Sequence, residues 1–324
     1  MAKDCVGESD GLTFWLARSE DYDDVMAISE DIYWGNDYLP HRYHAWLTEP
    51  QRVVMLAKRE GKLVALESGL VVDDGRTVVV EGLRVCPSER GKGVAGTVQR
   101  FTDQYIQRLY PSIQVKRLTR GDNSGPQKLA KFTLLDRRAV LSLRGESVTF
   151  DAFLSELKTK LSVKEGPAPE LVVLDEGEQL RGVLLDPEIT SRLQLPGGAV
   201  IQDWQPLRPI ESNLEVLRRR GLTWLADRAA SPTFLSFHTP PYPIPYNGGS
   251  LRLNIDLFGT GLAPARRALL SHLERVRGGL VGMVLVHVYM HRSLWEGLRD
   301  FCEVSTGVCR CRDYWEQLFL EREL

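Results

Sequence analysis

The chain has 324 residues, of which 43% are hydrophobic and 26% are charged, enough for a sizeable core and about two domains. Its 41 basic and 43 acidic residues give a net charge of −2, without the basic surplus typical of nucleic-acid-binding proteins. No apolar leader is visible at the N-terminus, and the most apolar stretch, 280–290, is too short to span a bilayer. Five cysteines form no disulfide framework in a chain of this size. We therefore expect a cytoplasmic protein that associates with neither nucleic acid nor membrane.

The first half reads as a mixed α/β unit. Three of its strands are separated only by REGK and VDDGRT, short turns that leave no room for crossover helices, so these strands are antiparallel. Apolar periodicity and turn residues predict the following order. Strands lie at 11–18, 52–59, 63–72, 77–86, 113–119 and 139–144, and helices lie at 21–29, 41–48, 94–109 and 126–135.

The second half repeats part of this order. A charged, Pro- and Gly-containing linker at 162–170 suits a domain boundary, and the Pro- and Tyr-rich stretch 238–249 is typical of an ordered loop. The succession that follows suggests a diverged internal duplication. It comprises a strand at 251–258, a turn at Gly259–Gly261, a helix at 264–277, a strand at 280–288 and a helix at 293–301.

The segment from Arg90 to Gly96, RGKGVAG, lies between a predicted strand and a predicted helix. Glycines at such a junction let the backbone approach a ligand closely. The first N–H groups of the helix are unpaired, and its dipole is positive at that end. Arg90 and Lys92 add positive charge, so a phosphate or pyrophosphate is the natural occupant.

The three glycines of this segment also satisfy G-x-G-x-x-G, the dinucleotide-binding fingerprint. That fingerprint belongs to a parallel βαβ unit, whereas an antiparallel meander precedes it here. The acidic residue expected about 20 positions later falls near Lys116 and Arg117, which carry the opposite sign. A Walker A loop is excluded because no Gly-Lys-Ser/Thr ends the segment.

The segment Val85 to Ala95, VCPSERGKGVA, resembles motif A of the GNAT N-acetyltransferases, V-x-P-x-x-R-G-x-G-x-A. The predicted element order over 11–145 also resembles the GNAT fold, an α/β (α+β) fold whose mixed sheet begins with antiparallel strands. The sequences GNDYLPHRYHAWL and VVVEGLRVCPSERGKGVAGTVQRF, with the long C-terminal extension, resemble the vertebrate histidine N-acetyltransferases. The resemblance implies a GNAT domain at 1–146, a connecting segment at 147–170, and a degenerate GNAT-like domain without cofactor at 171–324.

The resemblance implies acetyl-CoA as the acetyl donor, with a small amino acid as acceptor. The pyrophosphate would bind the backbone amides of Arg90 to Ala95, and the pantetheine arm would pair with the backbone of Leu83 to Val85. Gly82 suits a β-bulge that opens the slot for that arm. The cofactor-binding residues are then Leu83, Arg84, Val85, Arg90, Gly91, Lys92, Gly93, Val94, Ala95 and Asn123.

Acetyl transfer to an amine needs a group that accepts the amine's proton. Glu81 lies among apolar residues just before the expected bulge, where desolvation would raise its pKa, so we expect it to be the general base. The alternative is a structural charge paired with an arginine such as Arg84. Glu67 on the preceding strand is the reserve candidate.

Many GNAT enzymes use a Tyr on the helix after the second motif strand as general acid. In this chain the corresponding region keeps Asn123 but has Ala130 or Phe132 where that Tyr is expected. Solvent or the departing thiolate would then suffice, since a thiol has a pKa of about 8.5. Asn123 is either a cofactor contact or a helix N-cap, and the two roles are compatible.

The aromatic loop from Tyr33 to Pro40 lies on the acceptor side of the GNAT fold. Tyr33, Trp34 and Tyr38 are candidates to wall an imidazole, and Asp37 is a candidate to accept its N–H. The alternative is a hydrophobic plug beneath a helical turn. His and Cys spacings complete no ligand set, so we expect no metal.

The sequence thus predicts an acetyl-CoA-dependent N-acetyltransferase that acetylates the α-amine of a small amino acid, with L-histidine the first choice on resemblance. A protein acetyltransferase acting on a lysine or N-terminal amine is the first alternative. A non-catalytic acetyl-CoA-binding module is the second, favoured by the missing Tyr and opposed by the presence of Glu81.

Overall fold

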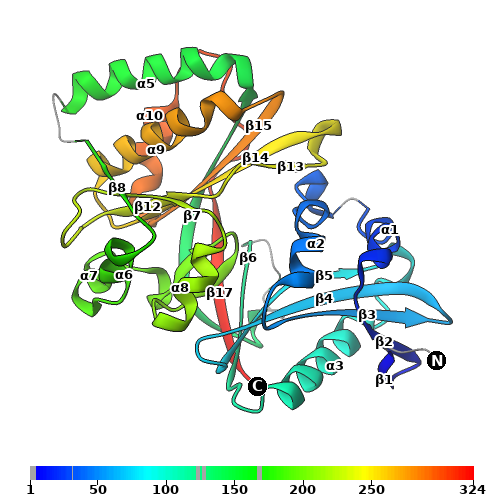
Figure 1. Cartoon of the computed structure of the whole chain (residues 1–324). Coiled ribbons are helices and arrows are strands. Elements are labelled where there is room, and N and C mark those ends of the chain that lie inside the picture. Colours follow the sequence, from blue (N-terminus) through cyan, green and yellow to red (C-terminus); the bar gives the residue numbers. More distant parts are fainter. Residues whose placement is uncertain (1–4, 31, 122–124, 126–128, 166–169) are drawn as a thin grey trace. The chain divides into compact units, whose positions relative to one another are not determined.

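The structure is a computed structural model that describes residues 5–30, 32–121, 125, 129–165 and 170–324. It divides into two compact units (Figure 1). Unit 1 consists of Met1–Leu118, Ile244–Asn247 and Arg322–Leu324, and unit 2 consists of Thr119–Pro243 and Gly248–Glu321.

Five strands of unit 1 form an antiparallel meander in sequence order, and a sixth lies parallel to the fifth. The chain can reverse tightly between β3 and β4 because Gly61 adopts a left-handed conformation, with φ +79°. The strands are β1 (Cys5–Ser9), β2 (Leu12–Leu16), β3 (Arg52–Arg59), β4 (Lys62–Val72), β5 (Thr77–Val85) and β6 (Val115–Gly121), the last of which belongs to unit 1 as far as Leu118.

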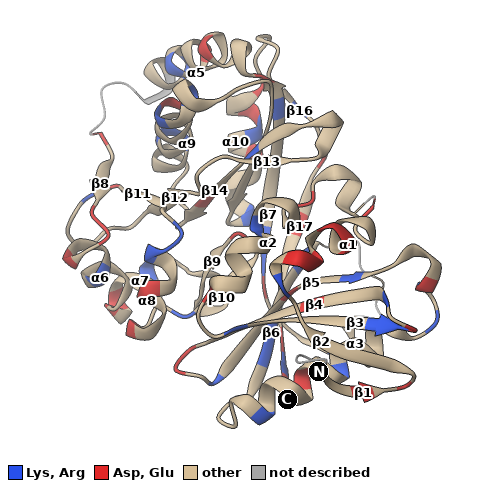
Figure 2. Ribbon diagram, turned by 45° about the vertical axis from the view of Figure 1, so that its right-hand side comes forward, with Lys and Arg blue, Asp and Glu red and all other residues tan. Residues whose placement is uncertain are grey.

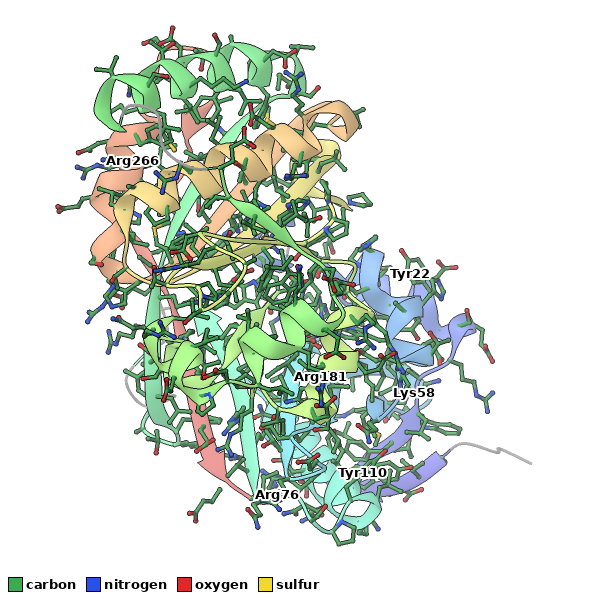
Figure 3. The ribbon with its side chains drawn as sticks, turned by 60° about the vertical axis from the view of Figure 1, so that its left-hand side comes forward. Tyr22, Lys58, Arg76, Tyr110, Arg181 and Arg266 are labelled. Atoms are coloured by element: carbon green, nitrogen blue, oxygen red, sulfur yellow. The ribbon has the colours of Figure 1, made fainter. Side chains whose placement is uncertain are left out.

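Helices cover both faces of this meander. On one face, α1 (Tyr22–Ala27) and α2 (Leu39–Thr48) pack residues such as Tyr43 against the apolar side chains of β3 and β4. Tyr22, labelled in Figure 3, stacks on His44 of α2 with ring centroids 5.0 Å apart. On the other face, α3 (Val94–Leu109) buries one apolar stripe. The predicted strand 52–59 and helix 94–109 are found with those bounds.

Two distant segments of the chain complete unit 1. Arg322 donates a hydrogen bond to Asp103 of α3, and the N–H of Leu324 donates one of 3.0 Å to the carbonyl of Gln114. The segment Ile244–Asn247 clusters with the same unit, because the backbone of Tyr246 lies against Gly35. Unit 1 is therefore discontinuous in sequence.

In unit 2 the strands follow the order β17-β7-β15-β14-β12-β11-β8. Among the described residues of this order, β14 and β15 pair in parallel and the other neighbours pair antiparallel. The strands are β7 (Thr133–Glu146), β8 (Val172–Leu174), β9 (Val200–Gln202), β10 (Gln205–Leu207), β11 (Thr223–Ala226), β12 (Leu235–His238), β13 (Tyr242–Ile244), β14 (Ser250–Phe258), β15 (Met283–Met290), β16 (Cys309–Arg310) and β17 (Trp315–Glu323).

The apolar face of this sheet is covered by three helices, which lie side by side in Figure 1. They are α5 (Phe150–Glu165), α9 (Leu262–Val276) and α10 (Trp295–Cys302). The remaining helices of the unit are α6 (Glu178–Leu184), α7 (Pro187–Arg192) and α8 (Glu211–Arg218). The strand–helix–strand–helix order predicted from 251 to 301 is found as β14, α9, β15 and α10.

The boundary between the units differs from the predicted one. The strand expected at 139–144 to complete the first half is β7, which belongs to unit 2 because it pairs with β15 from Ala139↔Met290 to Glu146↔Met283. The compact units accordingly separate at Leu118. Of the helix expected at 126–135, residue 129 is helical and residues from Thr133 are strand, while 126–128 lie outside the described residues. Of the linker expected at 162–170, the residues up to Glu165 belong to α5, and 166–169 lie outside the described residues.

Candidate functional site

The segment after β5 forms an open loop that ends at the first turn of α3. Gly91 and Gly93 both have φ +80°, and an added Cβ at either position would meet no atom within 4 Å. Gly93 is the N-cap of α3, and no side chain caps that end of the helix. The first amides of α3 are therefore left for an external acceptor, as an anion site at a helix N-terminus requires.

Charged side chains hold this loop in place. Arg90 donates from Nε to the carbonyl of Val85 at 3.0 Å, and Lys92 lies 3.1 Å from a carboxylate oxygen of Glu89. Glu89 also pairs with Arg59 at 3.0 Å. The guanidinium of Arg90 thus closes the loop, and the side chain of Lys92 is 55% exposed. The loop's shape and charge fit a pyrophosphate.

A β-bulge interrupts the pairing of β4 with β5. Ser68 is opposite Glu81 and Leu66 is opposite Arg84, so two residues of β5 face the single residue Glu67. Gly82, at the predicted bulge position, has φ +74°, a conformation that glycine adopts without a steric penalty.

The parallel pairing of β5 with β6 is short. It runs from Thr77↔Val115 to Val79↔Arg117, whereas β5 continues to Val85. The backbone of Leu83 to Val85 therefore lies beyond the part of β5 that pairs with β6. A bulge followed by strand separation is the arrangement that an inserted pantetheine arm requires, so the residues present fit acetyl-CoA.

Glu81 has an arginine partner that the sequence did not identify. Its Oε1 lies 2.6 Å from Nη1 of Arg52, whose Nε pairs with Glu49 at 2.5 Å. Nη1 of Arg52 also donates to Ser68 Oγ at 2.8 Å, and the guanidinium lies over the ring of Trp46. Glu81 therefore lies at the bulge and also pairs with an arginine, as the alternative reading of this residue expected. The partner is Arg52 instead of Arg84.

The reserve candidate Glu67 faces the opposite side of the sheet. Its carboxylate lies 3.7 Å from Nζ of Lys116, which in turn pairs at 2.6 Å with Asp103 of α3. Burial raises the pKa of Glu67, and Lys116 opposes that effect. Because Glu67 points toward α3 and Glu81 toward α2, only Glu81 shares a face with the aromatic loop.

Asp37 and Tyr38 meet Arg84 on that face. Nη2 of Arg84 donates to Oδ1 of Asp37, and its guanidinium lies 5.5 Å from the ring centroid of Tyr38. Tyr33 stacks on Tyr38 with centroids 6.3 Å apart. Burial, together with the nearby carboxylate of Glu81, raises the pKa of Tyr38 well above its usual range, so its hydroxyl stays protonated.

The aromatic loop is not a uniform hydrophobic plug. Trp34 is 76% exposed and Tyr33 is 49% exposed, and both have left-handed backbones with φ 53° and φ 51°. Asp37, in contrast, is buried, and its Oδ1 accepts hydrogen bonds from Arg84 and from the N–H of Leu39. The structure therefore brings together Tyr33, Tyr38, Glu81 and Arg84, while Asn123 lies outside the described residues.

Unit 2 has a different arrangement at the corresponding strands. β14 and β15 stay paired from Leu251↔Val284 to Asp256↔Tyr289, two residues before β14 ends. Strands that remain paired leave no slot between them for a pantetheine arm. This pairing supports the expectation that the second half works without a cofactor, and the expectation stays a prediction.

A buried polar face in unit 2 was not foreseen from the sequence. Arg252, Asn254 and Asp256 alternate with apolar residues along β14, a pattern typical of a strand with one solvated face, yet all three are buried. Arg138 pairs with Asp256 at 2.7 Å, and Asn254 donates to Asp203 at 2.8 Å. Burial raises the pKa of Asp256 to about 7, although Arg138 opposes the effect. These partners come from segments distant in the sequence, so no local pattern could indicate them.

In the view of Figure 2, basic and acidic residues are interspersed along the elements of each unit. Among the described residues, no helix has both the length and the apolar character needed to cross a membrane. In that same part of the chain, His, Cys, Asp and Glu side chains form no group of three or more that could hold a metal ion.

Two family models match the chain. One describes the GNAT acetyltransferase family and matches residues 19–109, and the other describes the C-terminal region of histidine N-acetyltransferase and matches residues 167–291. The human protein named "Probable N-acetyltransferase 16" is 44% identical over 98% of the chain and 87% of its own length. Histidine N-acetyltransferase of Scomber australasicus is 39% identical over 97% of the chain and 94% of its own length.

Solved structures show the same fold. A GCN5-related N-acetyltransferase from Sphaerobacter thermophilus matches with a TM-score of 0.53 at 11% identity, covering 98% of this chain and 97% of that one. A tandem GNAT protein from the clavulanic acid biosynthesis pathway matches with a TM-score of 0.51 at 14% identity, covering 96% of this chain and 98% of that one. The predicted GNAT fold is confirmed.

Proposed function

Because the chain belongs to the histidine N-acetyltransferase family of GNAT enzymes, we propose that it transfers an acetyl group from acetyl-CoA to the α-amine of L-histidine. The observation that carries the proposal is similarity to named histidine N-acetyltransferases over nearly the whole chain, 39% identity in the example from Scomber australasicus. The bulge and the open amide end of α3 support it independently, because they fit the proposed donor.

The proposed donor site has two parts. The amides from Arg90 to Ala95 would bind the pyrophosphate, and the backbone from Leu83 to Val85 would pair with the pantetheine arm. Acetyl-CoA supplies the acetyl thioester, whose thiol leaving group has a pKa of about 8.5 and departs without a dedicated acid. This agrees with the absence of Tyr at positions 130 and 132.

Glu81 is the proposed general base. It lies at the bulge on the acceptor face, where it can accept the proton of the attacking amine directly or through one water molecule. Arg52 fixes the position of its carboxylate through Oε1. Tyr33 and Tyr38 are the proposed walls for the imidazole, and Asp37 lies at the base of the same loop.

The test measures release of free thiol from acetyl-CoA in the presence of each of the twenty amino acids and of a lysine-containing peptide. We expect strong turnover with histidine and little with the others. Turnover with the peptide alone would make the protein a protein acetyltransferase. Acetyl-CoA binding without turnover would make it a binding module.

A pair of variants tests the base. Glu81→Gln should lower kcat by roughly 10²–10⁴-fold while acetyl-CoA binding is retained. Glu49→Gln is the matched control, because Glu49 pairs with the same guanidinium but is not the proposed base. Equal kcat for the two variants would remove Glu81 from the mechanism.

A further inference from the structure

The aromatic loop is attached to β5 by a buried ion pair. The side chain of Arg84 is 0% exposed and that of Asp37 is 5% exposed. Oδ1 of Asp37 accepts hydrogen bonds from Nη2 of Arg84 and, at 2.9 Å, from the N–H of Leu39 at the start of α2. Nη1 of Arg84 donates to the carbonyl of Gly82 in the bulge at 2.8 Å. One guanidinium therefore joins the bulge, the loop and α2.

The loop itself has a backbone that requires such support. Tyr33, Trp34 and Gly35 are consecutive left-handed residues with φ 51°, 53° and 84°. For non-glycine residues this conformation costs energy and persists only where the surroundings impose it. Two contacts hold the backbone of this loop, one at Gly35 and one at Asp37. A Cβ on Gly35 would lie 2.9 Å from Cα of Tyr246, and Asp37 is held by Arg84.

The same guanidinium also contacts the aromatic walls. It lies 5.5 Å from the ring centroid of Tyr38, on which Tyr33 stacks. A cation at this distance attracts the ring face and restricts its orientation. Loss of the Arg84 charge would therefore release the loop and reorient both rings, whereas the backbone of residues 84 and 85 would keep its pairing with β4.

We infer that Arg84 and Asp37 are a positioning pair that holds the Tyr33–Tyr38 loop in its acceptor-binding conformation, so that this pair sets the affinity for the amino-acid acceptor. The inference rests on the proposed function, because the acceptor is the one proposed above. It assigns Asp37 a role in ordering the loop instead of a direct hydrogen bond to the imidazole.

Unit 1 contains a matched control pair. Arg117 and Asp73 are 2.7 Å apart, and each side chain is 3% exposed, so this pair is buried to the same degree as Arg84 and Asp37. Neither residue belongs to the aromatic loop or to the bulge. Breaking either pair leaves a buried carboxylate without its arginine, so both changes should destabilise unit 1 comparably.

The experiment compares Arg84→Gln, Arg117→Gln and the double variant Arg84→Gln/Asp37→Asn. We expect Arg84→Gln to raise the KM for histidine roughly 10–100-fold, as misplacement of substrate-positioning groups does, with acetyl-CoA affinity within about 2-fold of the parent protein. Arg117→Gln should leave both values unchanged. The double variant should be no worse than Arg84→Gln alone, because it removes the unpaired charge.

Hydrogen exchange provides a readout that does not depend on the acceptor. Amides of residues 32–38 should exchange faster in Arg84→Gln than in Arg117→Gln at equal global stability. Asp37→Asn serves as the single-site test if Arg84→Gln does not fold. Unchanged exchange in the loop, or a histidine KM raised equally by Arg117→Gln, would overturn the inference. Faster exchange without histidine turnover in the parent protein would instead refute the proposed acceptor and leave the positioning pair standing.

Discussion

Substitution of Gly82 by Ala tests whether the bulge in β5 depends on the absence of a side chain. An added Cβ would lie 2.8 Å from Cη2 of Trp46 and 3.3 Å from Nη1 of Arg84. The residue also has φ +74°, where an L side chain is strained. Two separate penalties therefore act at this one position.

The magnitudes can be separated. The left-handed conformation costs an alanine about 1–2 kcal/mol. Contact with the buried indole of Trp46 adds about 1–3 kcal/mol, the usual cost of overpacking a core. The control is Gly61→Ala, because Gly61 has φ +79° and no atom within 4 Å of an added Cβ. That variant should bear only the first penalty.

The assay is urea-induced unfolding followed by tryptophan fluorescence, together with acetyl-CoA binding measured by calorimetry. We expect Gly82→Ala to be less stable than Gly61→Ala by about 1–3 kcal/mol. Its acetyl-CoA affinity should fall about tenfold, equivalent to about 1.4 kcal/mol of binding free energy, because the displaced bulge would narrow the proposed slot for the pantetheine arm. Equal stability and equal affinity of the two variants would refute the reasoning.

Three further predictions concern other positions. Gly93→Ala should weaken acetyl-CoA binding in calorimetry with little change in folding beyond the strain at φ +80°, and unchanged affinity would contradict the phosphate site. Trp34→Ala should leave the free energy of unfolding within about 0.5 kcal/mol because the indole is exposed, but should raise the KM for histidine. Burial lowers the pKa of His238 from 6.5 to about 4, so between these values protons bind preferentially to the unfolded chain. The free energy of unfolding should therefore fall by up to about 3 kcal/mol as the pH drops from 6.5 to 4. Urea titrations should show a smaller fall in His238→Gln, and an equal fall in the two proteins would contradict the role of His238.

Local patterns predicted much of unit 1 well. The meander from β3 to β5 was correct because its turns are short and its strands pair with their neighbours in sequence. The open N-terminus of α3 was correct because glycine and charge mark it locally. The place of β7 in unit 2 could not be predicted in this way, since its pairing with β15 joins residues more than 130 positions apart and leaves no trace in the strand's own sequence.

The site shows the same division between local and distant information. The bulge at Gly82 was predicted from its place before the motif, and the role of Glu81 beside it stays a proposal. The partners that define their environment were not, because Arg52 reaches Glu81 across 29 positions and Arg84 reaches Asp37 across 47. A single sequence shows which charges exist, but the register of the folded sheet decides which of them meet.

The discontinuity of unit 1 has a consequence for how the protein is made. Translation delivers β1 to α3 early, yet Asp103 of α3 acquires Arg322, and Gln114 acquires Leu324, only after about two hundred further residues have been synthesised. Domains generally fold as units during synthesis, and long loops delay the contacts that close them. Unit 2 likewise needs β17 as far as Glu321, so both units are completed only when the last residues of the chain have been synthesised, although unit 1 begins first.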